Sequence, residues 1–295
     1  MGQGSQSQFC VDDATPFDAS SIPFEFIPPF GLKGSRDIVN TSGVRGTRSA
    51  HSLRSRLAGK TVAGDIVLPV SALMLDWWFP KILGANASGT SFAVAETIPE
   101  FVAMIDAASK VFSYTGCKVS KAVFRGSAQS PLITCTLSII GKDYSIGNSG
   151  TFPALTMPVD LPYLFNELVL TVDGTSRECE DFELTIDNVG EARRGNDFAA
   201  TAVKIKDRIV TLAFTNPFES TDVDLLSVAI GGMAASLVWT PSGGDCSTTI
   251  TLPCLQIPVD LPTIQGKDQI TNRITAVARR TDAAAEISVT HDSDL

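Results

Sequence analysis

Histidines and paired carboxylates would supply the chemistry of a catalytic or metal site, and the sequence contains few of either. Only two histidines occur, His51 and His291. We expect His51 to lie exposed among arginines and His291 to lie in a frayed acidic C-terminal segment. Asp222 and Asp224 are most simply explained as acidic residues in the first turn of a helix, where the helix dipole favours them. No third ligand follows at a recognisable spacing, so we predict no metal site.

Short catalytic motifs are also missing. The sequence contains no GxSxG, HExxH or CxxC, which are the commonest signatures of hydrolases and zinc sites. Gly59-Lys60-Thr61 looks like the end of a phosphate-binding loop, but that motif requires a glycine where Arg54 stands. We therefore predict that the protein is not an enzyme and has no catalytic residue and no cofactor.

Trp77 and Trp78 are the remaining side chains that suggest ligand binding, because tryptophans can stack on sugar rings. On an amphipathic helix, one of them is more simply a core residue and the other a contact at a subunit interface, the role that we assign to Trp77. The six cysteines are predicted to be reduced, mostly buried thiols. They are Cys10, Cys117, Cys135, Cys179, Cys246 and Cys254.

Basic residues concentrate in residues 33–60, which we call the basic segment. Seven basic residues stand there against Asp37 alone, a net charge of +6 in a chain of net charge −9, so the rest of the chain carries −15. Its many Gly, Ser and Thr and few large apolar residues predict a long loop or arm. The basic residues are Lys33, Arg36, Arg45, Arg48, Arg54, Arg56 and Lys60.

Three interpretations of the basic segment are open. It is a solvated loop without a task, a DNA-binding element, or an arm that docks on another copy of the chain. DNA binding is disfavoured because aromatic residues for base stacking are missing and the acidic body repels phosphate. We favour docking on the acidic surface of a neighbouring copy. The residues expected at that contact are Arg36, Arg45, Arg48, Arg54 and Arg56, together with Trp77.

Runs of Val, Ile, Thr and Phe, separated by Gly, Pro, Asn and Asp, predict a mainly β protein. The run 182–187 alternates in hydropathy, as expected for a sheet with one wet face. Two helices interrupt the strands. The first is predicted between a Ser71 N-cap and a stop at Gly84, and the second within residues 216–232. The clearest strands are 65–70, 118–124, 132–140, 168–173, 182–187, 208–214, 235–240, 248–252 and 269–278.

The two strand–helix segments look like copies of one unit. Val67 aligns with Val210 at an offset of 143, and residues 123–126 align with 263–266 at an offset of 140. We infer an internal duplication that gives two tandem β-sandwich or β-barrel domains, each with one short flanking α-helix. The first, residues 1–160, includes an N-terminal arm and the basic segment. The second, residues 161–295, ends in an acidic tail.

Composition and charge exclude several classes of protein. A hydrophobic fraction of 44% in 295 residues supports a substantial core, and a pI near 4.7 argues against general binding to nucleic acid. The longest apolar run, residues 225–239, is too short to span a bilayer, so we expect no membrane segment. The N-terminus lacks the features of a secretory signal, so we expect folding in the cytosol.

The order of several short strings resembles the major tail tube proteins of long-tailed, siphovirus-like bacteriophages, in a two-domain form. The likeness runs from about Gly31 to Arg280. It implies a β-sandwich with a flanking helix, whose copies form rings with a continuous inner β-barrel that stack into a hollow tube for the genome. The strings are GDIVLPV at 64–70, LDWWFPKILG at 75–84, YTGCKV at 114–119, FRGS at 124–127 and DFELTIDN at 181–188.

The resemblance implies a structural protein of the virion tail that assembles in the host cytoplasm, with itself as the main partner. If single-domain relatives close a ring with six copies, a two-domain chain closes it with three, and a hexamer is the alternative. Other tail proteins would bind the tube ends, and genomic DNA would pass an acidic inner wall without tight binding. The competing interpretation is an extracellular β-sandwich adhesin or carbohydrate-binding module. A hydrolase on a β scaffold is a distant third.

Overall fold

The computed structural model describes residues 4–40, 43, 46, 47, 49, 51–88, 90–218, 232–242, 246–258, 264 and 270–292. In these ranges nearly all regular structure is antiparallel β-strand, and α1 (Ala72–Leu83) is the one α-helix. This confirms the mainly β class. The second predicted helix and most of the 263–266 landmark lie outside the described residues.

The first half of the chain, residues 1–160, contains strands β1 to β10. They are β1 (Gln8–Asp12), β2 (Ile22–Phe24), β3 (Lys33–Asn40), β4 (Ser55–Pro69), β5 (Gly84–Ser88), β6 (Ser91–Val94), β7 (Phe101–Asp106), β8 (Lys110–Ser127), β9 (Thr134–Gly141) and β10 (Asp143–Asn148).

The second half, residues 161–295, contains strands β11 to β20. They are β11 (Leu168–Val172), β12 (Thr175–Arg177), β13 (Asp181–Asp187), β14 (Gly190–Arg194), β15 (Ala200–Ile205), β16 (Ile209–Pro217), β17 (Met233–Trp239), β18 (Ser247–Gln256), β19 (Thr271–Ala278) and β20 (Ser288–Asp292).

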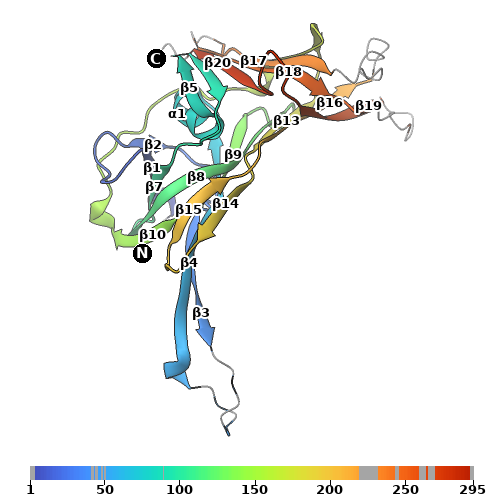
Figure 1. Cartoon of the computed structure of the whole chain (residues 1–295). Coiled ribbons are helices and arrows are strands. Elements are labelled where there is room, and N and C mark those ends of the chain that lie inside the picture. The colour runs from blue at the N-terminus through green and yellow to red at the C-terminus, as the bar shows by residue number, and fades with distance from the viewer. Residues whose placement is uncertain are drawn as a thin grey trace.

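Strand β8 is 18 residues long and takes part in two sheets. Its first part pairs with β7 and β10, and its second part lies between β9 and β13. Strand β9 pairs in turn with β4, and β13 continues through β16 to β19. A continuous sheet in the order β4-β9-β8-β13-β16-β19 therefore crosses from the first half to the second (Figure 1). We call it the central sheet.

Smaller groups of strands continue from the central sheet. In the first half, β1 lies between β2 and β7. In the second half, β11 lies between β12 and β17, and β17 pairs with β18. Strand β18 also pairs with β20, which pairs with β6 of the first half. Two pairs of neighbouring strands, β8–β13 and β6–β20, thus join the two halves.

The helix α1 forms where the sequence predicts it. The Ser71 side chain accepts a hydrogen bond from the Met74 backbone N–H and caps the first turn, and Gly84 ends the helix with φ of 103°. A left-handed residue at this position is favourable for glycine because it has no Cβ. The face with Leu75, Trp78 and Phe79 is buried, so tertiary packing holds the helix in place.

The core is continuous across the two halves. From Asp181 to Asp187 side chains alternate between half-buried and buried, which confirms the predicted one-sided strand. Rings from both halves meet near Trp239, whose centroid lies 6.4 Å from that of Phe124 and 6.0 Å from that of Phe182. Such aromatic packing contributes beyond simple area burial, so each half stabilises the other.

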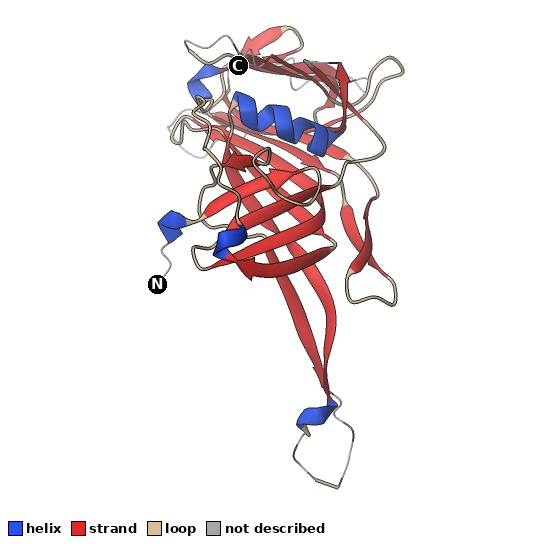
Figure 2. Cartoon of the chain, turned by 90° about the vertical axis from the view of Figure 1, so that its left-hand side faces the viewer, coloured by secondary structure: helices blue, strands red, loops and turns tan. Residues whose placement is uncertain are grey.

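Strands β3 and β4 form a long hairpin, which we call the arm and which projects away from the body (Figures 1 and 2). Most of the described part of the basic segment is therefore paired β-structure. Of the two expected forms, a long loop or an arm, the structure has the arm. Hydrogen bonds between Lys33–Asn40 and Ser55–Ala63 satisfy the backbone of the arm even though few of its side chains are buried.

Candidate assembly surfaces

The outer part of the arm combines exposed apolar and basic side chains. Leu53 is 86% exposed and Ile38 is 62% exposed, and Val39 and Leu57 are also open to solvent. Arg54 and Arg56 are exposed beside them, whereas Arg45 and Arg48 lie outside the described residues. Sequence reasoning found the charges but missed the apolar residues, because they are isolated in a polar segment. A patch of both kinds on a projecting hairpin is suited to contact with another chain.

The base of the arm is braced by the β14–β15 hairpin of the second half. The Lys60 N–H donates to the Phe198 carbonyl at 2.6 Å, and Arg194 donates to Lys60 O and Thr61 Oγ1. Arg36 does not face solvent freely, because its guanidinium lies 4.6 Å from the Phe198 ring centroid and its Nε donates to Ala58 O. Arg36 therefore holds the arm in place and is less available to a neighbour than Arg54 or Arg56.

Strand β10 supports the other side of the same base. The Lys60 ammonium lies 2.6 Å from Asp143 Oδ1 and 5.1 Å from the Tyr144 ring centroid. Gly34 passes so close to this ring that an added Cβ would lie 2.4 Å from Tyr144 Cδ1. The arm thus leaves the body from a fixed point and in a fixed direction.

Trp77 lies half-buried in an aromatic cluster of α1 and its neighbours. Its ring packs 4.6 Å from Trp78 and 5.5 Å from Phe101, measured between centroids, and Lys81 lies 5.2 Å above it. Trp78 is fully buried, in agreement with the expectation that one of the two tryptophans is a core residue. The interface role of Trp77 stays a prediction.

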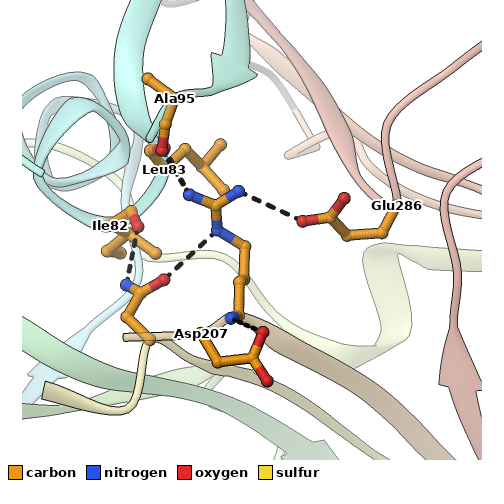
Figure 3. A network of polar contacts seen from close by, with 7 residues as sticks. Ile82, Leu83, Ala95, Asp207 and Glu286 are labelled. Atoms are coloured by element: carbon orange, nitrogen blue, oxygen red, sulfur yellow. Dashed lines mark hydrogen bonds and ion pairs between the residues drawn. The ribbon is translucent and has the colours of Figure 1, made fainter. Parts of the chain in front are cut away.

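A partly buried polar network joins the second half to the C-terminal end of α1 (Figure 3). Arg208 donates from Nη2 to Ala95 O at 2.6 Å, and its Nη1 lies 3.2 Å from Glu286 Oε1. Asn188, fully buried, donates from Nδ2 to Ile82 O at 2.9 Å and accepts from Arg208 Nε at 3.3 Å. These side chains satisfy carbonyls at and near the helix end, and no local pattern in the sequence predicts the network.

His291 is buried in the structure, so the expectation of a frayed position is wrong. Strand β20 pairs with β18 and β6 and carries the ring into the core. Its Nδ1 lies 2.7 Å from Thr248 Oγ1 and its Nε2 lies 3.1 Å from Ala72 O. Burial lowers the pKa of His291, and the nearby Asp76 carboxylate partly opposes this shift. With both nitrogens hydrogen-bonded, the imidazole is a structural group.

Other potentially reactive groups are inaccessible or isolated. His51 is exposed in the basic segment, as predicted, and accepts a hydrogen bond from the Leu53 N–H. Four of the six free cysteines are buried, and burial raises the pKa of Cys10 and Cys117 to about 12, so neither thiol is ionised at neutral pH. Within the described ranges no three His, Cys, Asp or Glu side chains are grouped for a metal ion, while Asp222 and Asp224 lie outside these ranges. Across the same ranges we find no helix with the length and apolar character needed to span a membrane.

Comparison with known proteins agrees with this architecture. The family model described as phage tail tube protein matches residues 3–289, which is nearly the whole chain. A search among curated proteins gives no match. Because the family match covers both halves, the arm and the central sheet, the chain belongs to the phage tail tube protein family.

Proposed function

We propose that the chain assembles with copies of itself into rings that stack into the hollow tube of the virion tail, and that the genome is delivered through this tube. The observation that carries the proposal is the family match over residues 3–289. The central sheet supports it, since a sheet that already crosses two halves of one chain is suited to continue from chain to chain. Closing the sheet into a barrel would remove its exposed edges.

The order of strand pairing supports two equivalent halves. Pairing runs β2-β1-β7-β8-β9-β4 in the first half and β12-β11-β17-β18-β19-β16 in the second. Val67 pairs with Thr136, and Val210 pairs with Ala278, so the offsets are 143 and 142. This agrees with the offset inferred from the sequence and favours domains at 1–160 and 161–295.

Two equivalent halves imply a ring of three chains with approximate sixfold symmetry. The β8–β13 junction inside each chain would then resemble the junction between chains. The test is negative-stain imaging of the concentrated protein together with native mass spectrometry of isolated rings. We expect rings or tubes whose unit has three times the 31.3 kDa mass of the chain. Six chains per ring would contradict the duplication, and a stable 31.3 kDa monomer would contradict the proposed assembly.

A further inference from the structure

One face of the central sheet packs on the core. The opposite face, which we call the open face, consists mostly of half-buried or exposed side chains, with Val123 and Ala213 buried among them. One row of directly paired residues crosses all six strands of the open face without a charge. The row consists of Val67, Thr136, Val123, Thr185, Thr211 and Val277.

The charged residues of the open face lie outside this neutral row. Arg125 and Glu183 lie in the next row on one side, with Asp181 and Arg273 one row further, and Lys121, Asp187 and Asp65 lie in the next row on the other side. Arg125 is directly opposite Glu183 across the β8–β13 junction, with 2.8 Å between Nε and Oε2. Arg273 reaches Asp181 two strands away, with 2.9 Å between Nη1 and Oδ1. Lys121 stands opposite Asp187 in the same register. Each cation of this face therefore has a carboxylate as partner or cross-strand neighbour.

The charge of the open face is consequently close to zero. Three cations stand against four carboxylates, the fourth being Asp65 beside Ser138. The segment of the chain with a large net positive charge is the basic segment, residues 33–60, which includes the arm. In the described rows no aromatic side chain is found, so the open face lacks the stacking groups that hold nucleic-acid bases. Guanidiniums paired with carboxylates attract phosphate less than free ones, because the nearby negative charge offsets theirs.

The position of the core decides where this face points if the sheet closes into a ring. The helix and the aromatic cluster pack on the opposite side, where the Phe79 and Trp239 ring centroids lie 6.3 Å and 6.4 Å from that of Phe124. These bulky parts fit outside the barrel, so the open face would line the inside. This step rests on the proposed tube.

We propose that the open face is the surface past which duplex DNA moves, and that Glu183 and Asp181 keep Arg125 and Arg273 from binding its phosphates. A free arginine would add a salt-dependent attraction, repeated in every subunit along the wall. Pairing each guanidinium with a carboxylate engages one of its donors and offsets its charge. This differs from a strongly acidic wall, since DNA is kept from sticking by neutralised cations rather than by repulsion alone.

The test removes the carboxylates and leaves the arginines. Glu183→Gln combined with Asp181→Asn should make assembled tubes retain short duplex DNA at about 50 mM salt and release it at about 200 mM. A control with the same charge change is Asp18→Asn combined with Asp173→Asn, since both residues lie in turns outside the open face. Wild type and control should leave the DNA in the supernatant after sedimentation.

A rescue variant separates charge from structural damage. Adding Arg125→Gln and Arg273→Gln to the first pair of substitutions should abolish the retention again. The same four proteins, unassembled, are compared by fluorescence anisotropy with a labelled duplex, so a variant that folds but forms no tube still gives a reading. The first variant should bind more tightly than the control of equal net charge.

Distinct outcomes would overturn this inference and the proposed function. Equal DNA binding by the first variant and its control would contradict the inference alone. Loss of assembly in the first variant but not in the control would identify the open face as a contact between chains, which also contradicts it. Failure of the wild-type chain to form any ring or tube would contradict the proposed function.

Discussion

The arm and the junction between the two halves use arginine in opposite ways. Arg208, where the second half meets the end of α1, is half-buried with its side chain 14% exposed. It pairs with the Glu286 carboxylate of its own half and donates to main-chain carbonyls of the first half. Arg54 and Arg56 on the arm are exposed, beside apolar residues that are also exposed. The comparison indicates that the contacts of Arg208 stabilise the single chain, whereas the exposed side chains of the outer arm contribute little to its stability.

The largest effect on chain stability is expected at the junction. Arg208→Met would leave the half-buried Glu286 carboxylate without this partner and remove the donor from Ala95 O. We expect the free energy of unfolding to fall by about 1–3 kcal/mol, measured by urea denaturation. The control is Arg193→Met on exposed β14, which should change it by less than about 0.5 kcal/mol. A loss at Arg208 no larger than at Arg193 would remove the contrast between junction and arm.

The second-largest effect is a pH dependence of the unfolding free energy. It arises at His291 on β20, the strand that pairs with β6 of the first half. The fold lowers the pKa of His291, so its contribution to stability is present above the usual histidine pKa near 6.5 and is lost as pH falls below it. Titration of one proton changes the unfolding free energy by at most about 1.4 kcal/mol per pH unit. Urea denaturation between neutral and mildly acidic pH should show this slope in wild type and in His51→Asn. It should be reduced in His291→Asn, and an unchanged slope there would place the titrating group elsewhere.

Reversing charges on the arm should affect assembly far more than stability. Arg54→Glu with Arg56→Glu should prevent or slow tube formation, followed by light scattering, because these arginines are expected to face carboxylates of a neighbour. The unfolding free energy of the monomer should change by no more than about 0.5 kcal/mol. The matched Arg54→Lys with Arg56→Lys keeps the charge and should assemble. Normal assembly of the reversed protein would assign the arm another use.

The smallest effect on stability is expected at the tip of the arm. Leu53 is 86% exposed, so Leu53→Ser removes no core packing and should leave the unfolding curve unchanged. If the apolar residues of the arm are buried by a neighbour, the same change should raise the protein concentration needed for assembly. A comparable substitution at Val189, exposed on the body, is the control. Equal behaviour of the two variants would mean that charge alone acts in the arm.

The features predicted from sequence are those with local signals. The helix from Ala72 to Leu83 was found because Ser71, Gly84 and the apolar spacing all lie within a few turns. Strand β13 was found because its alternation is visible in seven residues. The hairpin form of the arm was missed, since it depends on pairing between Lys33–Asn40 and Ser55–Ala63 and not on buried side chains.

Long-range partners could not be predicted in this way. The β8–β13 junction pairs residues about sixty positions apart, and the Asn188 network joins residues more than a hundred positions apart. No local pattern specifies such contacts, because register depends on the whole sheet. His291 shows the same limit: its acidic surroundings suggested a frayed end, and only pairing with β18 and β6 explains its burial.

The membership of β8 in two sheets has a consequence for synthesis of the chain. The ribosome completes β8 at Ser127, but its partner β13 is finished only at Asp187. At a rate of about 5–20 residues per second, the nascent chain carries an unpaired edge from Lys121 to Ser127 for roughly 3–12 seconds. Charged side chains on an edge discourage pairing with other chains, and Lys121 and Arg125 stand there. These two residues would thus guard the growing polypeptide against aggregation before their carboxylate partners have been made.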